Sequence, residues 1–222
     1  MKYRPILFSG PMVLAILEGR KTQTRRVVKP AIVKDLDFLG GAEYPDEVSV
    51  KIGAGYGQPG DKLWVRETWQ YVDWTNVGQP YIGYKADGKR IVHRDVPEEW
   101  STRLEDIWRH LSKPENFDID NRAADRRWCP SIYMPRWASR ITLEITHVQI
   151  ERLQAINEMD ARAEGVYLCS VEGGGYKFAR GEQEYDTAVK AYRELWDDLN
   201  AARGYGWNTN PWVWVLEFRR VE

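Results

Sequence analysis

SRITLEITHVQIERL, residues 139–153, is the strongest strand pattern in the chain. Apolar side chains at Ile141, Leu143 and Ile145 occupy every second position, which is the period of a strand with one buried face. PWVWVLEFRRV, residues 211–221, is apolar along most of its length and predicts a final strand. We expect its Trp212 and Trp214 to share one side and to pack against a helix. These two stretches predict the centre of a sheet.

Short strands and three modest helices are expected around this centre. The predicted strands lie at 6–8, from Thr22, at 62–69 and in a hairpin turning at Asp87-Gly88, and the predicted helices at 11–19, 157–165 and 184–202. Residues 29–58 stay unassigned, and about 95–130 has the character of an irregular, charged insertion. The order lacks a βαβ rhythm, so we predict an α+β protein built round a barrel-like sheet.

The composition limits the classes of partner. Its 32 Lys+Arg against 33 Asp+Glu give a net charge of −1, which excludes the most basic class of nucleic-acid binders. The chain has 11 Trp, which indicate a large aromatic core or an exposed stacking surface. Arg outnumbers Lys, and Arg is the cation that stacks on aromatic rings and forks onto phosphate.

Metal, cofactor and membrane sites are not expected. The two cysteines, Cys129 and Cys169, are far apart and lack zinc-ligand spacing, as do the three histidines. No stretch of about twenty apolar residues and no signal peptide is found. The sequence therefore predicts reduced thiols and a cytoplasmic location, with no cofactor.

The segment GRKTQTRR, residues 19–26, gathers hydroxyls and cations in a short space. A threonine hydroxyl becomes a nucleophile when a base accepts its proton, and a lysine serves as base when burial or neighbouring cations lower its pKa. The alternative is a basic turn that leads into an edge strand. The residue types alone leave both interpretations open.

The whole chain resembles the ASCH-domain proteins of phages and prophages, in the PUA-like barrel superfamily. The matching stretches are PILFSGPMVLAILEGRKTQTRRVVKP, PGDKLWVRETW, PSIYMPRWASRITLEITHVQIERLQAINEMDARAEGV and FRRV. The resemblance implies one PUA-like (ASCH) domain over residues 1–222, an α+β barrel with short flanking helices. Residues of about 70–128 and 167–186 are then elaborations. The ASCH signature G-x-K-x-x-E-x-R is met at Gly19, Lys21 and Arg26, whereas Thr24 stands in its Glu position.

A bacterial ASCH subgroup with the same GRKTxTxR form hydrolyses N4-acetylcytidine to cytidine and acetate. This resemblance implies a catalytic set of Lys21, Thr24 and Glu164, with Glu158 as the alternative acid. Lys21 is then the base towards Thr24 Oγ1 or water, and Glu164 carries protons to the leaving amine. On a regular strand Lys21 and Thr24 have opposite parity, so they converge only if the chain turns or bulges.

Basic and aromatic neighbours predict a substrate-binding surface. Arg66 and Trp69 suit a phosphate contact and a stacking platform, and Glu67 is either a pocket acid or the partner of an arginine. The same theme recurs at 136–137. The predicted substrate-binding residues are Arg26, Arg66, Glu67, Trp69, Arg136 and Trp137.

Three functions follow from these patterns. The first is an amidohydrolase acting on an N-acyl nucleoside. The second is a non-catalytic module that binds single-stranded RNA or a modified base, and the third is a ribonuclease. The predicted partner is in each case a nucleoside or nucleic acid. The sequence leaves open whether the protein is an enzyme, and also its oligomeric state.

Overall fold

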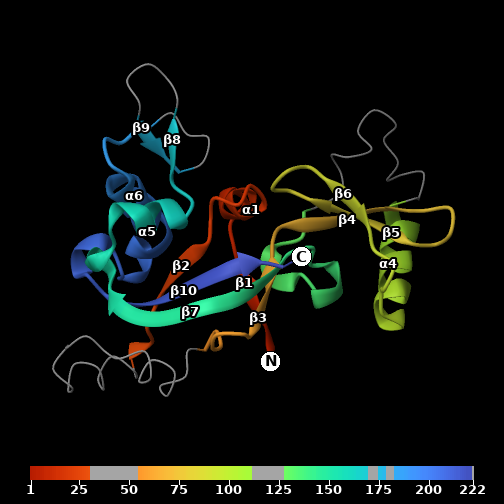
Figure 1. Ribbon diagram of the computed structural model, residues 1–222. Coiled ribbons are helices and arrows are strands. Elements are labelled where there is room, and N and C mark those ends of the chain that lie inside the picture. The colour runs from red at the N-terminus through yellow and green to blue at the C-terminus, as the bar shows by residue number, and fades with distance from the viewer. Residues whose placement is uncertain (31–54, 112–127, 170–174, 179–182, 222) are drawn as a thin grey trace. The chain divides into compact units, whose positions relative to one another are not determined.

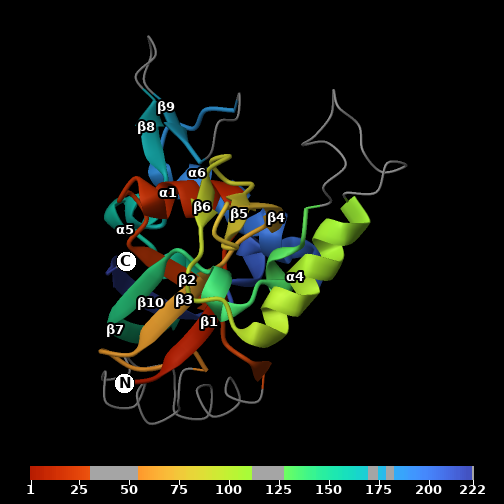
Figure 2. The same ribbon diagram turned by 90° about the vertical axis from the view of Figure 1, so that its right-hand side faces the viewer.

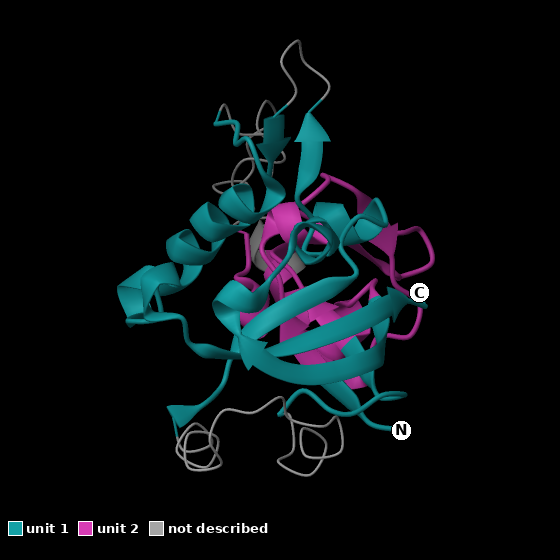
Figure 3. Ribbon diagram, turned by 60° about the vertical axis from the view of Figure 1, so that its left-hand side comes forward, with its two compact units in different colours: residues 1–4, 14–63, 142–222 teal, residues 5–13, 64–141 magenta. Residues whose placement is uncertain are grey.

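The computed structural model describes residues 1–30, 55–111, 128–169, 175–178 and 183–221. The chain divides into two compact units, shown in two colours in Figure 3. Unit 1 consists of Met1–Arg4, Leu14–Leu63 and Thr142–Glu222, and unit 2 of Pro5–Val13 and Trp64–Ile141. The single domain over residues 1–222 stays a prediction.

The largest sheet has five strands in the order β1-β3-β7-β10-β2. They span Tyr3–Leu7 (β1), Lys62–Arg66 (β3), Thr142–Arg152 (β7), Trp212–Arg220 (β10) and Gln23–Val27 (β2). The division between the units falls within β1, within β3 and within helix α1 (Gly10–Leu17). Strands combined with short helices confirm the α+β class. The described residues show no pairing between β1 and β2, the two ends of the strand order, so barrel closure is not confirmed.

The two stretches that predicted the sheet's centre are neighbours in it. β7 and β10 run antiparallel over nine residue pairs, with Trp214 opposite Ile150, and a register shift between Glu217 and Phe218. Figures 1 and 2 show both strands bending together beside β2. Leu143 and Ile145 are buried, as the alternation predicts.

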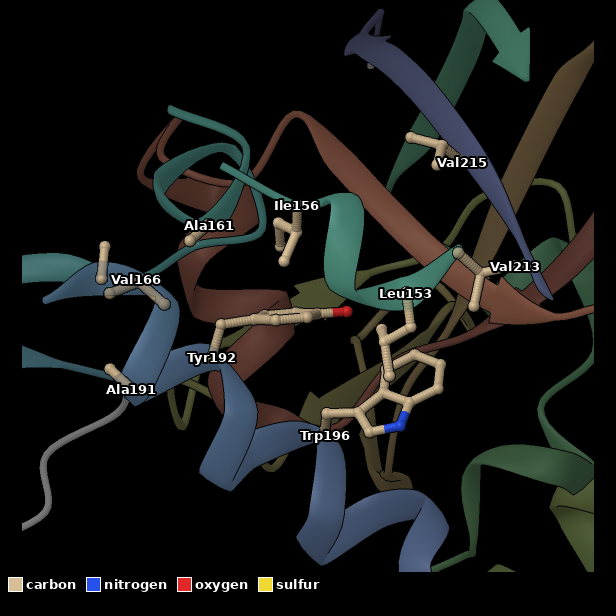
Figure 4. Close-up of a cluster of buried hydrophobic side chains, with 10 residues drawn as sticks. Leu153, Ile156, Ala161, Val166, Ala191, Tyr192, Trp196, Val213 and Val215 are labelled. Atoms are coloured by element: carbon tan, nitrogen blue, oxygen red, sulfur yellow. The ribbon is translucent and has the colours of Figure 1, made fainter. Parts of the chain in front are cut away.

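One face of unit 1's strands is covered by helices α5 (Glu158–Ala163) and α6 (Ala188–Asn200). Val213 and Val215 pack there with Trp196 of α6 (Figure 4). The expectation that Trp212 and Trp214 face the long helix is therefore wrong. β10 is buried at every position from 212 to 216, so alternation of polarity does not distinguish its two faces.

Both helices begin after residues that favour the N-cap position, and of these only Asn157 was predicted from the sequence. The Asn157 side chain accepts from the amides of Met159 and Asp160, and the Asp160 carboxylate accepts from the Asn157 amide, which completes a capping box. Thr187 caps α6. The Glu158 carboxylate also accepts from the first two amides of α6, Ala188 N at 2.8 Å and Val189 N at 3.2 Å, and so ties α5 to α6.

Unit 2 contains a three-stranded antiparallel sheet of β4 (Trp69–Trp74), β5 (Pro80–Tyr84) and β6 (Arg90–Val92). The turn predicted at Asp87-Gly88 joins β5 to β6, with Gly88 at a φ of 71°. The expectation of irregular chain at 95–130 is corrected in part by α4 (Glu98–Leu111). Two features of the sequence are typical of this helix. Acidic residues occupy its first turn, and Trp100 and Leu104 lie one turn apart. Residues 112–127 of that insertion lie outside the described residues.

The second predicted elaboration, 167–186, lies in unit 1. It contains a small hairpin of β8 (Tyr167–Cys169) and β9 (Gly175–Lys177). Residues 170–174 and 179–182 lie outside the described residues. Gly165 leads into this hairpin with a φ of 107°, a conformation that side chains rarely adopt.

We predict that Gly165→Ala destabilises the protein by about 2–4 kcal/mol, through the positive φ and through overpacking. An added Cβ would lie 3.0 Å from Ala15 Cβ and 3.2 Å from a ring carbon of Phe178. The matched control is Gly204→Ala, because Gly204 has a φ of 83° but open space around a Cβ. Urea unfolding of both variants measures the difference. Equal losses would show that the close approach at Gly165 contributes nothing.

Candidate active site

The chain around Lys21 is fixed by backbone hydrogen bonds from two helix ends. After α1 the amides of Arg20 and Lys21 both donate to Ala15 O, at 2.8 and 3.0 Å. The Thr22 amide donates to Ala163 O at the end of α5, at 2.8 Å. These bonds hold Lys21 beside the last turn of α5 before β2 begins.

Lys21 is buried and its ammonium meets three acceptors. Nζ donates to Gln23 O at 2.8 Å, to Glu164 O at 2.8 Å and to Glu164 Oε2 at 2.6 Å. The side chain of Lys21 is 0% exposed and that of Glu164 is 2% exposed. Two residues separated by 143 positions in sequence therefore form a water-excluded ion pair.

Glu164 is placed by the end of α5. It is the C-cap of that helix, and its amide donates to Asp160 O at 2.8 Å. Gly165 follows with its positive φ and brings its own carbonyl to Arg20 Nη1 at 2.6 Å. The alternative acid, Glu158, lies at the other end of α5 and binds the first amides of α6. The fold thus brings Glu164, and not Glu158, to Lys21.

Arg25 on β2 is a second cation on the same carboxylate. Its Nη1 is 3.3 Å from Glu164 Oε1 and donates to Gln23 Oε1 at 2.5 Å. Its Nε and Nη2 donate to Glu151 Oε1 on β7 at 2.9 and 2.8 Å. Asp160 lies 3.3 Å from Nη2. The guanidinium group of Arg25 is therefore surrounded by carboxylates and one amide oxygen.

Tyr192 reaches the same group from α6. It is buried in the cluster beneath α6, and the charge of the nearby Glu164 carboxylate contributes to a raised pKa of its phenol. Burial raises the pKa of Tyr192 well above its usual value, so the phenol remains a donor. Figure 4 shows its ring projecting from α6 with the hydroxyl at the end away from the helix.

Two effects act on Lys21 in opposite directions. Burial lowers the pKa of Lys21, because the charged form loses its hydration, whereas the Glu164 carboxylate raises it. Arg25 and Arg26 add to the lowering. The net effect is a pKa of Lys21 below its ordinary value, which is the direction that a lysine base requires.

The register of β2 separates the predicted residues into two faces. Arg25 pairs with Val215, a residue of the cluster beneath α6, whereas Thr24 pairs with Leu216 and Arg26 with Trp214. Directly paired residues share a face of the sheet, and neighbours along a strand alternate. Thr24 and Arg26 therefore lie on the face opposite Arg25, and β2 is regular between positions 23 and 27.

The other predicted binding residues all belong to unit 2. Arg66 lies over the Trp64 ring at 4.6 Å and donates to Ile132 O at 3.1 Å. The rings of Trp69 and Trp137 pack edge to face with their centroids 6.3 Å apart. Each ring also packs edge to face against Trp100, with centroid distances of 6.3 Å for Trp69 and 5.7 Å for Trp137. Arg136 is exposed. That these residues form one nucleobase-sized site with Lys21–Arg26 stays a prediction.

Glu67 has an arginine partner. It is buried and receives two bonds from Arg140, Nε to Oε1 at 2.8 Å and Nη2 to Oε2 at 2.9 Å. Arg140 Nη1 also donates to Asp87 at 2.8 Å, and its guanidinium lies over the Tyr84 ring at 4.1 Å. Of the two interpretations left open for Glu67, the ion pair is the one that the structure shows.

Sequence reasoning missed Arg25, Tyr192 and Glu151 as members of the Lys21 cluster. Arg25 is part of the GRKTQTRR segment. Its position two residues after Gln23 on a predicted strand indicates that the two side chains lie on the same face. Tyr192 was placed on the apolar face of the long helix, where its ring does lie. Within the described residues no His, Cys, Asp and Glu side chains form a group able to hold a metal ion. No helix of the described chain has the length and apolar character needed to cross a membrane.

We predict that Glu164→Gln lowers the free energy of unfolding by about 3–5 kcal/mol, because it leaves two buried cations without their shared carboxylate. Lys21→Met should cost less, since Glu164 then keeps Arg25. The control is Asp186→Asn, which removes the exposed Lys190–Asp186 pair and should cost under about 1 kcal/mol. Chemical denaturation gives the three values. A larger loss for Lys21→Met would reverse the assigned order.

Comparisons with known proteins give one solved structure. No family model matches the chain, and no curated protein matches it. An ASCH domain from Lactobacillus crispatus JV V101 is similar at 13% sequence identity, with a TM-score of 0.38. The match covers 99% of this chain and 80% of that chain.

Proposed function

We propose that this chain is an ASCH-type protein that hydrolyses an N-acyl amide on a nucleoside, with N4-acetylcytidine as substrate. The observation that carries the proposal is the 2.6 Å contact between Lys21 Nζ and Glu164 Oε2. Motif resemblance alone selected these two residues, and the fold joins them across 143 positions of sequence. As part of this proposal, the five-stranded sheet closes into the barrel of the PUA-like fold.

The buried pair supplies both a base and an acid. Transfer of one proton from Lys21 to Glu164 converts ammonium and carboxylate into a neutral amine and a carboxylic acid, and burial favours the uncharged forms. The amine accepts a proton from the attacking nucleophile, and the carboxylic acid donates one to the leaving amine nitrogen. The products are cytidine and acetic acid, and the acid then loses its proton to solvent and leaves as acetate. The ammonium and the carboxylate are then restored without net proton uptake by the pair.

We assign the attack to water. Thr24 lies on the face of β2 opposite Arg25 and the Lys21 cluster, so its hydroxyl is not directed at Glu164. Arg25 contributes a fixed positive charge beside the pair, which stabilises a tetrahedral oxyanion. Because the side chains of Lys21 and Glu164 are buried, this arrangement is the closed resting state, and substrate enters when the surrounding side chains open.

We predict that Lys21→Ala lowers kcat/KM for N4-acetylcytidine by about 10²–10⁴-fold, the usual contribution of a general base. Acetate release, followed by chromatography, is the measurement. Lys190→Ala is the matched control, because Lys190 of α6 forms an exposed pair with Asp186, which precedes the helix. Thr24→Val should retain most activity if water attacks. Turnover that survives Lys21→Ala would contradict the assigned roles, and its loss in Thr24→Val would assign the attack to Thr24 instead.

A second candidate function, binding of single-stranded RNA or a modified base, is favoured by one feature of unit 2. The indole N–H groups of Trp69 and Trp137 are buried and have no hydrogen-bond partner in the described part of the chain. A buried donor without an acceptor costs free energy, which a bound base edge would recover. Arg136, next to Trp137, is exposed and suits a phosphate contact.

For this second function we predict that single-stranded RNA quenches Trp fluorescence with a steep dependence on salt. Arg136→Ala should reduce the slope of log affinity against log salt by about 1, the effect of losing one phosphate contact. Arg109→Ala on α4 is the control, since that arginine is exposed and paired within its own helix. Turnover of free nucleosides without oligonucleotide binding would exclude this function.

A further inference from the structure

We propose that Glu151 is a positioning residue, which holds Arg25 back from Glu164 and so leaves the Glu164 carboxylate able to exchange a proton with Lys21. No motif in the sequence assigns Glu151, which lies on β7, 13 positions before Glu164. The proposal rests on the proposed function for its activity readout, because it takes Lys21 and Glu164 as the reacting pair.

The first support is the register of the sheet. Glu151 of β7 pairs with Val213 of β10. Arg25 of β2 pairs with Val215, two residues further along β10. Both valines belong to the cluster beneath α6 and are shown in Figure 4. Directly paired residues share a face of the sheet, so Glu151 and Arg25 lie on the face that α5 and α6 cover. Because β10 lies between β7 and β2, the ion pair crosses over β10.

The second support is the way in which the hydrogen bonds of Arg25 are divided. Its Nε and Nη2 both donate to Glu151 Oε1, at 2.9 and 2.8 Å, so Glu151 occupies one whole edge of the guanidinium. Nη1 donates to Gln23 Oε1 at 2.5 Å and lies 3.3 Å from Glu164 Oε1. Hydrogen bonds between charged N–H and carboxylate groups normally measure about 2.7–2.9 Å. Arg25 therefore meets Glu164 through one long contact, and not through a pair of short hydrogen bonds.

This arrangement leaves Lys21 as the close partner of Glu164. Lys21 Nζ lies 2.6 Å from Glu164 Oε2. An arginine that binds a buried carboxylate through two short hydrogen bonds holds it in the ionised form. A carboxylate held in that way does not take the proton of Lys21, and the neutral amine and carboxylic acid that the reaction requires do not form. The contact of Glu151 with Arg25 keeps Arg25 from binding Glu164 in this manner.

Charged and titratable groups face Arg25 and Glu164 from the elements packed against them. They are Lys21 before β2, Arg26 on β2, Glu151 on β7, Asp160 on α5, Tyr192 on α6 and Glu217 on β10, which meets Gln23. Removal of the Glu151 charge takes away a nearby negative charge and frees Arg25 to approach Glu164. Both changes lower the affinity of the Lys21–Glu164 pair for its shared proton. The approaching guanidinium also stabilises the ionised carboxylate, so the shared proton shifts to Lys21.

The test is Glu151→Gln, which removes the charge and keeps the shape of the side chain. We expect the alkaline limb of the pH–rate profile for N4-acetylcytidine to move to lower pH by about 1 unit, because the pair loses its shared proton more easily. Glu151→Asp keeps the charge and should leave the limb in place. The matched control is Glu144→Gln, because Glu144 is a carboxylate of the same strand that pairs with Lys62 and Arg219. A shift of the same size in Glu151→Asp or in the control would overturn the proposal.

A second readout needs no catalysis. The ¹³C NMR signal of the Lys21 side chain reports how much of it is ammonium, and at neutral pH we expect that fraction to rise in Glu151→Gln. In an Arg25→Met background the same substitution should change the signal far less, because the residue through which Glu151 acts is gone. An undiminished change in that background would contradict the positioning role.

The two readouts separate this proposal from the proposed function. If the NMR signal moves as expected while no acylated nucleoside is hydrolysed, the positioning role of Glu151 holds and the proposed function fails. If neither the pH–rate profile nor the NMR signal moves and only stability falls, Glu151 has a structural role and the proposal is overturned.

Discussion

The buried contact between Lys21 and Glu164 is the constraint on which unit 1 depends. A charge removed from water is stable only if its partners are fixed, so the segments that carry the pair must be held accurately. The amides of residues 20–22 donate to Ala15 O and Ala163 O, and these bonds, the capping box of α5 and the positive φ of Gly165 together fix this placement. The same exclusion of water lowers the pKa of Lys21 below its ordinary value.

Local signals made much of the fold predictable from the sequence. The alternation in 139–153 predicted β7, the Asp87-Gly88 pair predicted the hairpin of unit 2, and Asn157 predicted the start of α5. Each depends on neighbouring residues alone. The faces of β10 were not predictable, because it is apolar on both sides, and α4 was missed because its charged residues resemble those of a loop.

The candidate site was predictable only as far as its motif reached. Lys21 and Glu164 were each named from the resemblance to a known motif, but nothing in the sequence measures the distance between them. Tyr192 and Glu151 enter the cluster through strand register and helix packing, which depend on long-range contacts. Glu158 shows the converse, since an acid that resembles a catalytic candidate in the sequence instead binds the first amides of α6.

The sharing of Glu164 by two cations also limits the order in which this cluster can change during evolution. A substitution that removes Lys21 or Arg25 leaves the carboxylate with one remaining cation, and the chain can tolerate it as a first step. A substitution that removes Glu164 first leaves two like charges together in the protein interior. Descendants that lose this buried ion cluster should therefore lose one of the two cations before the acid.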